Sequence, residues 1–150
     1  MKINFFSGIF VCLYFVALGV ASQAQPWTEN FDSGLANTYT NGVQTLTTGD
    51  WYTTAVFQES GTDSYGGTGH AARLNDDVQG ASLRTPALNT VGTITFYYRE
   101  LNSGGGTFSI QKSYNDSDWT EITSHAFSGN TFTEFSFDVN DDATTVYIRV

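Results

Sequence analysis

The sequence is poor in cysteine, proline and positive charge. Its 150 residues include one cysteine and two prolines, and charged residues make up only 14%. The chain has six Lys and Arg residues against 15 Asp and Glu residues, and the resulting negative field would repel a phosphate backbone. No segment shows a helical period of useful length. These shortages argue against a helical bundle, a coiled coil, a disordered tail and a nucleic-acid-binding domain.

The residues that are abundant favour an all-β domain with many turns. The chain holds 15 glycines and 21 threonines, and aromatic residues make up 15%. Threonine and the aromatic residues pack well on a pleated sheet, and glycine suits the turns between strands.

The first 24 residues have the order of a secretory signal peptide. Met1-Lys2 supplies a positive start, an apolar run extends from residue 3 to 20, and small residues at Ser22 and Ala24 predict cleavage after Ala24. The alternative is a retained membrane anchor, but the run is near the lower limit for a span of about 17–25 residues and no cationic stop follows it. Bulky residues precede Cys12, so lipidation is not expected.

Cleavage would leave residues 25–150 as one secreted or cell-surface domain without cysteine. Loss of Lys2 would leave five cations against 15 acidic residues, a formal charge of −10. No membrane contact is expected after cleavage.

Short β-prone segments at intervals of roughly 8–14 residues predict an antiparallel β-sandwich. In the clearest segment, Ile94, Phe96 and Tyr98 would face the core, and Thr93, Thr95, Tyr97 and Arg99 the other side. Residues 58–70 are expected to be a surface loop. The predicted strands lie in residues 43–48, 51–57, 72–74, 81–84, 93–99, 108–111, 119–122, 132–139 and 144–150.

Several of these segments also resemble a known family. Trp27-Thr28-Glu29-Asn30-Phe31-Asp32-Ser33, the Gly69–Leu74 and Ala81–Leu88 segments and Gly92–Arg99 resemble jelly-roll modules of secreted bacterial proteins, which are related in shape to MAM and carbohydrate-binding sandwiches. The resemblance covers nearly all of residues 26–150 and implies fold more than function. Such modules often have a further terminal strand, and the final apolar pattern here runs to Val150, so the domain is expected to be incomplete at its C-terminus.

Motifs for catalysis are lacking. His70 and His125 stand on separate segments without a nucleophile elbow or a zinc spacing. Glu100, Glu121 and Glu134 lie singly on different predicted strands, whereas glycoside hydrolysis needs a carboxyl pair. The glycine-rich residues 66–69 have no following lysine, as a phosphate loop requires. The chain is therefore expected not to be an enzyme.

A structural calcium ion is the one cofactor that the sequence suggests. Oxygen ligands cluster at a strand end in Asp138, Asn140 and Asp142, and Asp32 could join them from elsewhere. A solvated acidic turn is the alternative.

Aromatic residues on strands provide the binding hypothesis, because flat rings on a rigid sheet suit the apolar faces of sugars. If the strands of Tyr97 and Tyr147 are neighbours, the two tyrosines share a face with Arg99 and Arg149, which could bind a neutral or acidic glycan. The ligand-binding residues expected are Trp51, Tyr65, Tyr97, Arg99 and Tyr147, with Tyr52 and Trp119 as further candidates.

The sequence thus predicts a secreted, non-catalytic accessory module that binds polysaccharide or cell-surface material. Two alternatives remain open: a structural or protein-interaction domain of a larger secreted protein, and the N-terminal passenger of an extracellular nuclease, protease or glycanase whose catalytic part lies elsewhere. Further domains of a parent protein are expected as neighbours.

Overall fold

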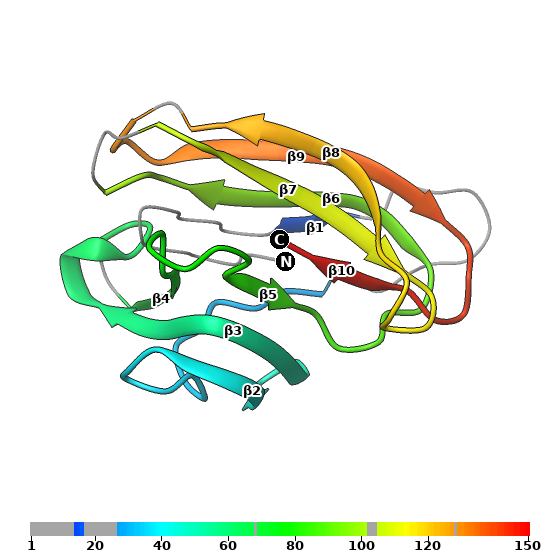
Figure 1. Cartoon of the computed structure of the whole chain (residues 1–150), viewed down its shortest axis with the longest axis horizontal. Coiled ribbons are helices and arrows are strands. Elements are labelled where there is room, and N and C mark those ends of the chain that lie inside the picture. The colour runs from blue at the N-terminus through cyan, green and yellow to red at the C-terminus, as the bar shows by residue number, and fades with distance from the viewer. Residues whose placement is uncertain (1–13, 17–26, 68, 102–104, 128) are drawn as a thin grey trace.

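The computed structural model describes residues 14–16, 27–67, 69–101, 105–127 and 129–150. These residues form two antiparallel sheets that pack face to face (Figure 1). The predicted all-β sandwich is confirmed. Within the same residues, no helix is both long and apolar enough to cross a membrane.

The two sheets differ in size. The smaller one consists of β1 (Tyr14–Val16), β6 (Val91–Tyr98) and β9 (Thr133–Asp141), in the order β1–β6–β9. The larger one consists of β2 (Thr40–Leu46), β3 (Gly49–Ser60), β4 (His70–Leu74), β5 (Ser82–Arg84), β7 (Thr107–Ser113), β8 (Thr120–Ala126) and β10 (Tyr147–Arg149). Its order is β2–β3–β5–β10–β7–β8, and β4 also pairs with β3.

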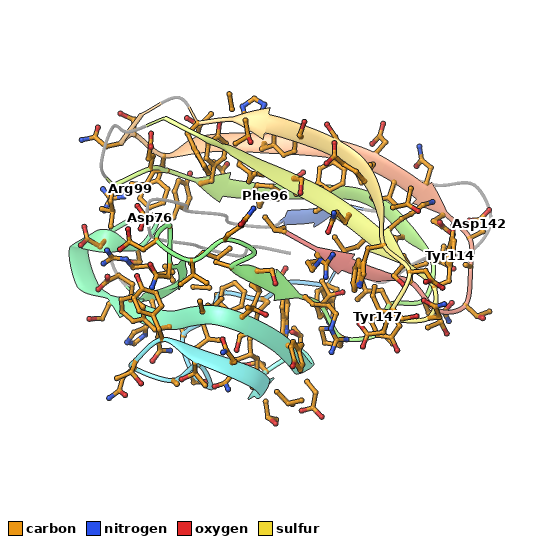
Figure 2. All side chains as sticks on the ribbon, viewed as in Figure 1. Asp76, Phe96, Arg99, Tyr114, Asp142 and Tyr147 are labelled. Atoms are coloured by element: carbon orange, nitrogen blue, oxygen red, sulfur yellow. The ribbon has the colours of Figure 1, made fainter. Side chains whose placement is uncertain are left out.

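The core between the sheets follows the predicted alternation along β6. Ile94, Phe96 and Tyr98 are at most 1% exposed. The Phe96 ring lies 5.6 Å from the ring of Phe108 on β7 and 5.2 Å from that of Phe135 on β9, and Figure 2 shows Phe96 in the middle of the molecule. Phe96 therefore ties the two sheets together through aromatic contacts.

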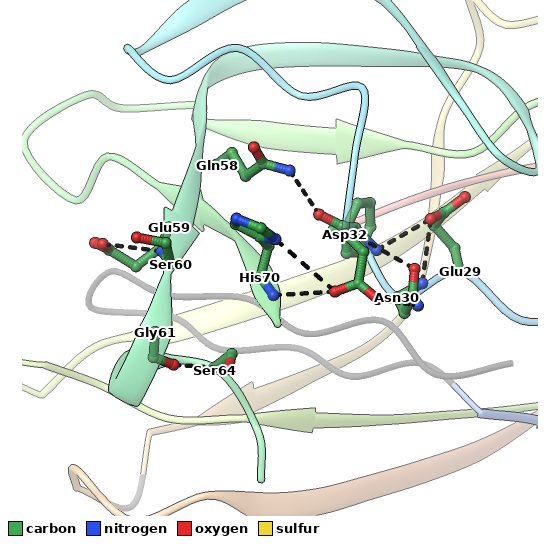
Figure 3. Close-up of polar contacts among 10 residues, drawn as sticks. Glu29, Asn30, Asp32, Gln58, Glu59, Ser60, Gly61, Ser64 and His70 are labelled. Atoms are coloured by element: carbon green, nitrogen blue, oxygen red, sulfur yellow. Dashed lines mark hydrogen bonds and ion pairs between the residues drawn. The ribbon is translucent and has the colours of Figure 1, made fainter. Parts of the chain in front are cut away.

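The segment before β2 is fixed by a buried carboxylate. Glu29 is 1% exposed. Its carboxylate oxygens accept hydrogen bonds from the backbone N–H groups of Asn30, Phe31 and Thr48 and from the Thr48 hydroxyl (Figure 3 shows Glu29 beside Asn30). These donors compensate for the loss of hydration, so the carboxylate holds this segment against the turn between β2 and β3.

Strand β3 changes its partner at Ala55. The residues before Ala55 pair with β5, and the residues after it pair with β4. Ala55 has a left-handed φ of 52° and donates its N–H to the Asn41 side chain at 2.6 Å. The expected loop over residues 58–70 is therefore wrong at both ends, because Gln58 to Ser60 still belong to β3 and His70 already begins β4, opposite Ser60. The connection between the two strands starts with the short 3-10 turn η1 (Gly61–Asp63).

Strand β1 comes from the segment predicted to be a signal peptide. It runs antiparallel to β6, with Phe15 opposite Ile94. Cys12 and the predicted cleavage site after Ala24 lie outside the described residues. Cleavage there would remove β1 and leave this edge of β6 without that partner strand.

Candidate functional site

A pocket of about 330 Å³ lies on the outer face of the larger sheet. Leu83 and Ile148 are 1% exposed and point into the core, so their neighbours along β5 and β10 point outward. The volume is at the lower end of the range for small-molecule pockets. The lining residues are Tyr52 and Thr54 of β3, Ser82 and Arg84 of β5, Asp116 and Trp119 of the β7–β8 connection, and Arg149 of β10.

A row of side chains across four strands forms the floor of this pocket. Tyr52 lies opposite Arg84, Arg84 lies opposite Arg149, and Arg149 lies opposite Gln111 of β7. Residues opposite each other in antiparallel strands lie on the same face and are in contact range. The sheet order thus places two guanidinium groups side by side.

Arg84 is held between two tyrosine rings and a carboxylate. Its guanidinium carbon lies 5.2 Å from the ring centres of Tyr52 and Tyr147. Its Nε lies 3.1 Å from Oδ1 of Asp116. Cation–π contacts and the ion pair fix the side chain and neutralise its charge locally.

The turn between β7 and β8 positions Asp116. Its φ is 63°, a left-handed conformation that aspartate tolerates better than most residues. Asn115 stabilises the turn by accepting hydrogen bonds from the N–H groups of Ser117 and Asp118 at 3.0 and 2.9 Å. The Asn-Asp-Ser-Asp sequence therefore builds one wall of the pocket.

Arg149 lies over the ring of Trp119, 4.1 Å from its centre. The Oε1 atom of Gln111 accepts hydrogen bonds from its Nε and Nη2. Burial lowers the pKa of the Arg149 guanidinium, with Asp116 acting to raise it and the charge of Arg84 to lower it further. Arginine remains charged despite such a shift.

The pocket thus combines groups that suit a sugar. Tyr52 is 43% exposed and offers a ring at the surface. The hydroxyls of Thr54 and Ser82 and the two guanidinium groups line the same space. Hydroxyls and guanidinium groups bind sugar oxygens, while the ring suits an apolar C–H face.

Of the five predicted ligand-binding residues, Tyr147 lies beside this pocket, through its contact with Arg84. The shared face predicted for Tyr97 and Tyr147 does not form, because β6 and β10 belong to different sheets. Figure 2 shows Arg99 and Tyr147 toward opposite ends of the molecule.

Tyr65, Tyr97 and Arg99 do come together, at a second place. The rings of Tyr65 and Tyr97 stack with centres 3.9 Å apart. Arg99 lies over the Phe132 ring at 5.1 Å and pairs with Asp63 of η1 at 2.5 Å. These contacts fasten the segment after β3 to β6. The rings of Tyr65 and Tyr97 therefore cover each other on the faces that a ligand would otherwise meet.

The hydroxyl of Tyr97 is engaged as well. It donates a hydrogen bond to Glu134 of β9. This bond, followed by a hydrogen bond with Tyr65, raises the pKa of the Tyr97 hydroxyl. A contribution of this cluster to ligand binding stays a prediction.

Trp51 does not lie at a binding surface. It is 1% exposed, and its ring stacks on Trp27 with centres 5.5 Å apart. Its indole N–H donates to the Thr48 hydroxyl at 2.9 Å. A ligand contact of Trp51 stays a prediction, and the ring as it stands is almost fully covered by other residues of the chain.

The predicted calcium ligands divide between two places. Asp32 accepts hydrogen bonds from the backbone N–H of His70 at 3.1 Å and from the Asn30 side chain (Figure 3). Asp138 on β9 accepts one from the Thr93 hydroxyl at 2.6 Å. Across the described ranges, no three His, Cys, Asp or Glu side chains form a group that could hold a metal ion. Calcium bound by Asp32, Asp138, Asn140 and Asp142 stays a prediction.

The two histidines are far from equivalent. His70 begins β4, and its Nδ1 lies 3.9 Å from Oδ1 of Asp32. His125 on β8 packs against the rings of Phe135 and Tyr98, at 4.8 and 5.6 Å. His125 thus extends the aromatic core.

The sequence pattern alone does not identify Arg84 and Asp116 as site residues. The sequence does contain a sign of the site for Arg84, because Ser82-Leu83-Arg84 and Tyr147-Ile148-Arg149 both place an apolar residue between two polar or aromatic ones, with the arginine on the side opposite the apolar residue. The signal becomes specific only when the strand order places β5 beside β10.

No family model matches the chain, and no curated protein or solved structure shows significant similarity to it.

Proposed function

We propose that this chain is a secreted, non-catalytic jelly-roll module that binds polysaccharide or cell-surface glycan through the pocket on its larger sheet. The observation that carries the proposal is the row from Tyr52 through Arg84 to Arg149, which places a ring and two guanidinium groups around one cavity. The predicted signal peptide and the resemblance to jelly-roll carbohydrate-binding modules support the same role.

A binding role suits this pocket better than hydrolysis. Among its seven lining residues, Asp116 is the one carboxylate, and it is paired with Arg84. Glycoside cleavage ordinarily needs two carboxyl groups across the scissile bond. The groups present recognise a ring and hold it, which is what an accessory module requires.

The test is retention of the protein on insoluble polysaccharides and on a glycan array. Tyr52→Ala and Trp119→Ala should each weaken binding at least tenfold, because Tyr52 offers the ring that would stack on a sugar and Trp119 supports the guanidinium of Arg149. Tyr39→Ala is the matched control, since Tyr39 is 41% exposed but packs on Phe57 outside the pocket. Equal loss in all three variants, or no retention of the unaltered protein on any glycan, would refute the proposal.

A protein-interaction role is the second candidate, and a different observation favours it. Removal of β1 would free the β6 edge at Thr93–Thr95. No residue of β6 is charged, so nothing along this strand would deter the addition of an extended segment. Pull-down with the chain lacking residues 1–24 tests this role, and partner capture that persists after Trp119→Ala would separate it from glycan binding.

A further inference from the structure

We propose that the pocket recognises a sugar that carries a carboxylate, as a uronic acid does, and that Arg149 binds this carboxylate. The inference rests on the proposed function of the same pocket and adds the chemical class of its ligand.

The distribution of ion pairs sets Arg149 apart from the other cationic side chains. In the part of the chain that the structure describes there are five cationic side chains. Four of them, Arg73, Arg84, Arg99 and Lys112, lie between 2.5 and 3.1 Å from a carboxylate oxygen. Arg149 is the fifth, and no carboxylate of these residues lies within ion-pair distance of it. In a chain with 15 acidic residues, a partly buried guanidinium without a carboxylate is a group whose lost hydration is incompletely compensated.

The guanidinium of Arg149 is also held in a fixed orientation. Its plane is supported by the Trp119 ring, and Gln111 occupies the edge formed by Nε and Nη2. Within the described residues, Nη1 has no hydrogen-bond partner. A guanidinium fixed in this way keeps N–H groups in position for a carboxylate, with little side-chain entropy left to lose on binding.

The charge balance inside the pocket favours the binding of one carboxylate. Arg84 and Arg149 face each other across β5 and β10, and like charges at opposite positions repel. Asp116 pairs with Arg84, so one positive charge remains uncompensated. One carboxylate would compensate it and relieve the repulsion.

The other lining groups favour a sugar as the carrier of that carboxylate. Tyr52 offers an exposed ring beside Arg84, and the hydroxyls of Thr54 and Ser82 lie in the same pocket. A uronic acid ring presents an apolar face, hydroxyls and a single carboxylate, and each finds a matching group here.

The experiment compares uronic acid oligosaccharides with their carboxyl-reduced counterparts. Galacturonate, glucuronate and mannuronate oligomers are each paired with the neutral oligomer of the same linkage, and affinities are measured by isothermal titration calorimetry. We expect at least one acidic oligomer to bind about tenfold tighter or more than its reduced form, the effect of one charge-assisted hydrogen-bond pair.

Variants assign the effect to Arg149. Arg149→Gln should make the acidic and reduced forms bind alike, and Arg149→Lys should keep part of the preference, because it keeps the charge without the planar donors. Arg73→Gln is the matched control: Arg73 also lies over a ring, that of Phe57, but outside the pocket, so its variant should keep the full preference. Melting curves of each variant establish that it is folded.

Three results would overturn the inference, and they differ in what else they refute. Equal binding of acidic and reduced oligomers would refute recognition of a carboxylate, but it would leave the proposed glycan binding intact. A preference that survives Arg149→Gln would remove the assignment to Arg149. If the protein binds no acidic oligomer but is retained on neutral polysaccharides, the inference about the carboxylate is refuted and the proposed glycan binding stands. If it binds neither acidic oligomers nor neutral polysaccharides, the proposed function is refuted as well.

Discussion

Replacing Glu29 tests whether a buried carboxylate fixes the N-terminal segment to the larger sheet. Its oxygens accept four hydrogen bonds, and one donor, the N–H of Phe31, belongs to a residue that is 0% exposed. Glu29→Ala removes all four of these acceptor contacts, and the donors of Asn30 and Thr48 can partly reach water in its place. Since a hydrogen bond contributes about 0.5–1.5 kcal/mol net, we expect a total loss of about 3 kcal/mol of unfolding free energy.

Glu29→Gln separates hydrogen bonding from shape. Its amide oxygen can still accept from Asn30 and Phe31, but its NH₂ group would face the N–H of Thr48, which is also a donor. We expect a loss of about 1.5 kcal/mol, half that of the alanine variant.

The assay is urea unfolding followed by tryptophan fluorescence, because Trp27 and Trp51 stack beside this carboxylate's partner Thr48. The midpoints should fall in the order unaltered protein, Glu29→Gln, Glu29→Ala, with the slope unchanged. Glu121→Ala, at an exposed position of β8, is the control and should stay within about 0.5 kcal/mol. A Glu29→Ala midpoint equal to that of the control would refute the anchoring role.

Three further predictions concern the β6 edge, calcium and acid. Deletion of residues 1–24 should speed amide hydrogen exchange along β6, measured by mass spectrometry, because β1 no longer covers its backbone; unchanged exchange would contradict the pairing. Calcium should raise the melting temperature if the acidic turn binds it, and Asp138→Ala should abolish the shift; no shift with calcium in excess would end the calcium prediction. Burial alone would raise the pKa of Asp141, but hydrogen bonds from Lys112 and Tyr114 lower it overall. The folded state therefore gains stability above the ordinary pKa of about 3.9 and loses it as the pH falls below that value. Asp141→Asn should lose less stability than the unaltered protein between pH 5 and pH 2 in urea unfolding, and parallel curves would refute this.

Local alternation predicted most of the strands and their buried faces, but it did not predict β1 or the extension of β3 to Ser60. The apolar set on β6 was correct because a side chain's face in a strand depends only on its neighbours in sequence. The same logic applies to the predicted strand over residues 144–150, where Val146 and Ile148 are buried. It gave no account of Trp51, because the burial of this ring depends on Trp27 and on the contact between Glu29 and Thr48. Trp27 and Glu29 are far from Trp51 in sequence, so local alternation does not contain these contacts.

The site required the order of the strands, which alternation does not contain. The sequence supplied Tyr147 and Arg149 as outward-facing residues, but it placed them with the wrong neighbours. Pairing between β5 and β10 joins Arg84 to Arg149 although the two residues are far apart in sequence. A turn that tolerates a left-handed aspartate then brings Asp116 over the same strands.

An acidic protein with a pocket for an acidic sugar is physically consistent, because the two electrostatic effects act over different distances. Charges separated by more than about 8–10 Å are largely screened at physiological salt, whereas a guanidinium in contact with a carboxylate at a partly buried site is not. The charge that a single bound carboxylate meets is therefore set by Arg149, Arg84 and Asp116 rather than by the formal charge of −9 of the whole chain. A nucleic acid carries a phosphate charge about every 1.7 Å of duplex, so it would set many charges against the acidic surface for each one placed in the pocket. Under the proposed function, the same charge distribution would repel a nucleic acid more strongly than a sugar oligomer with one carboxylate per ring.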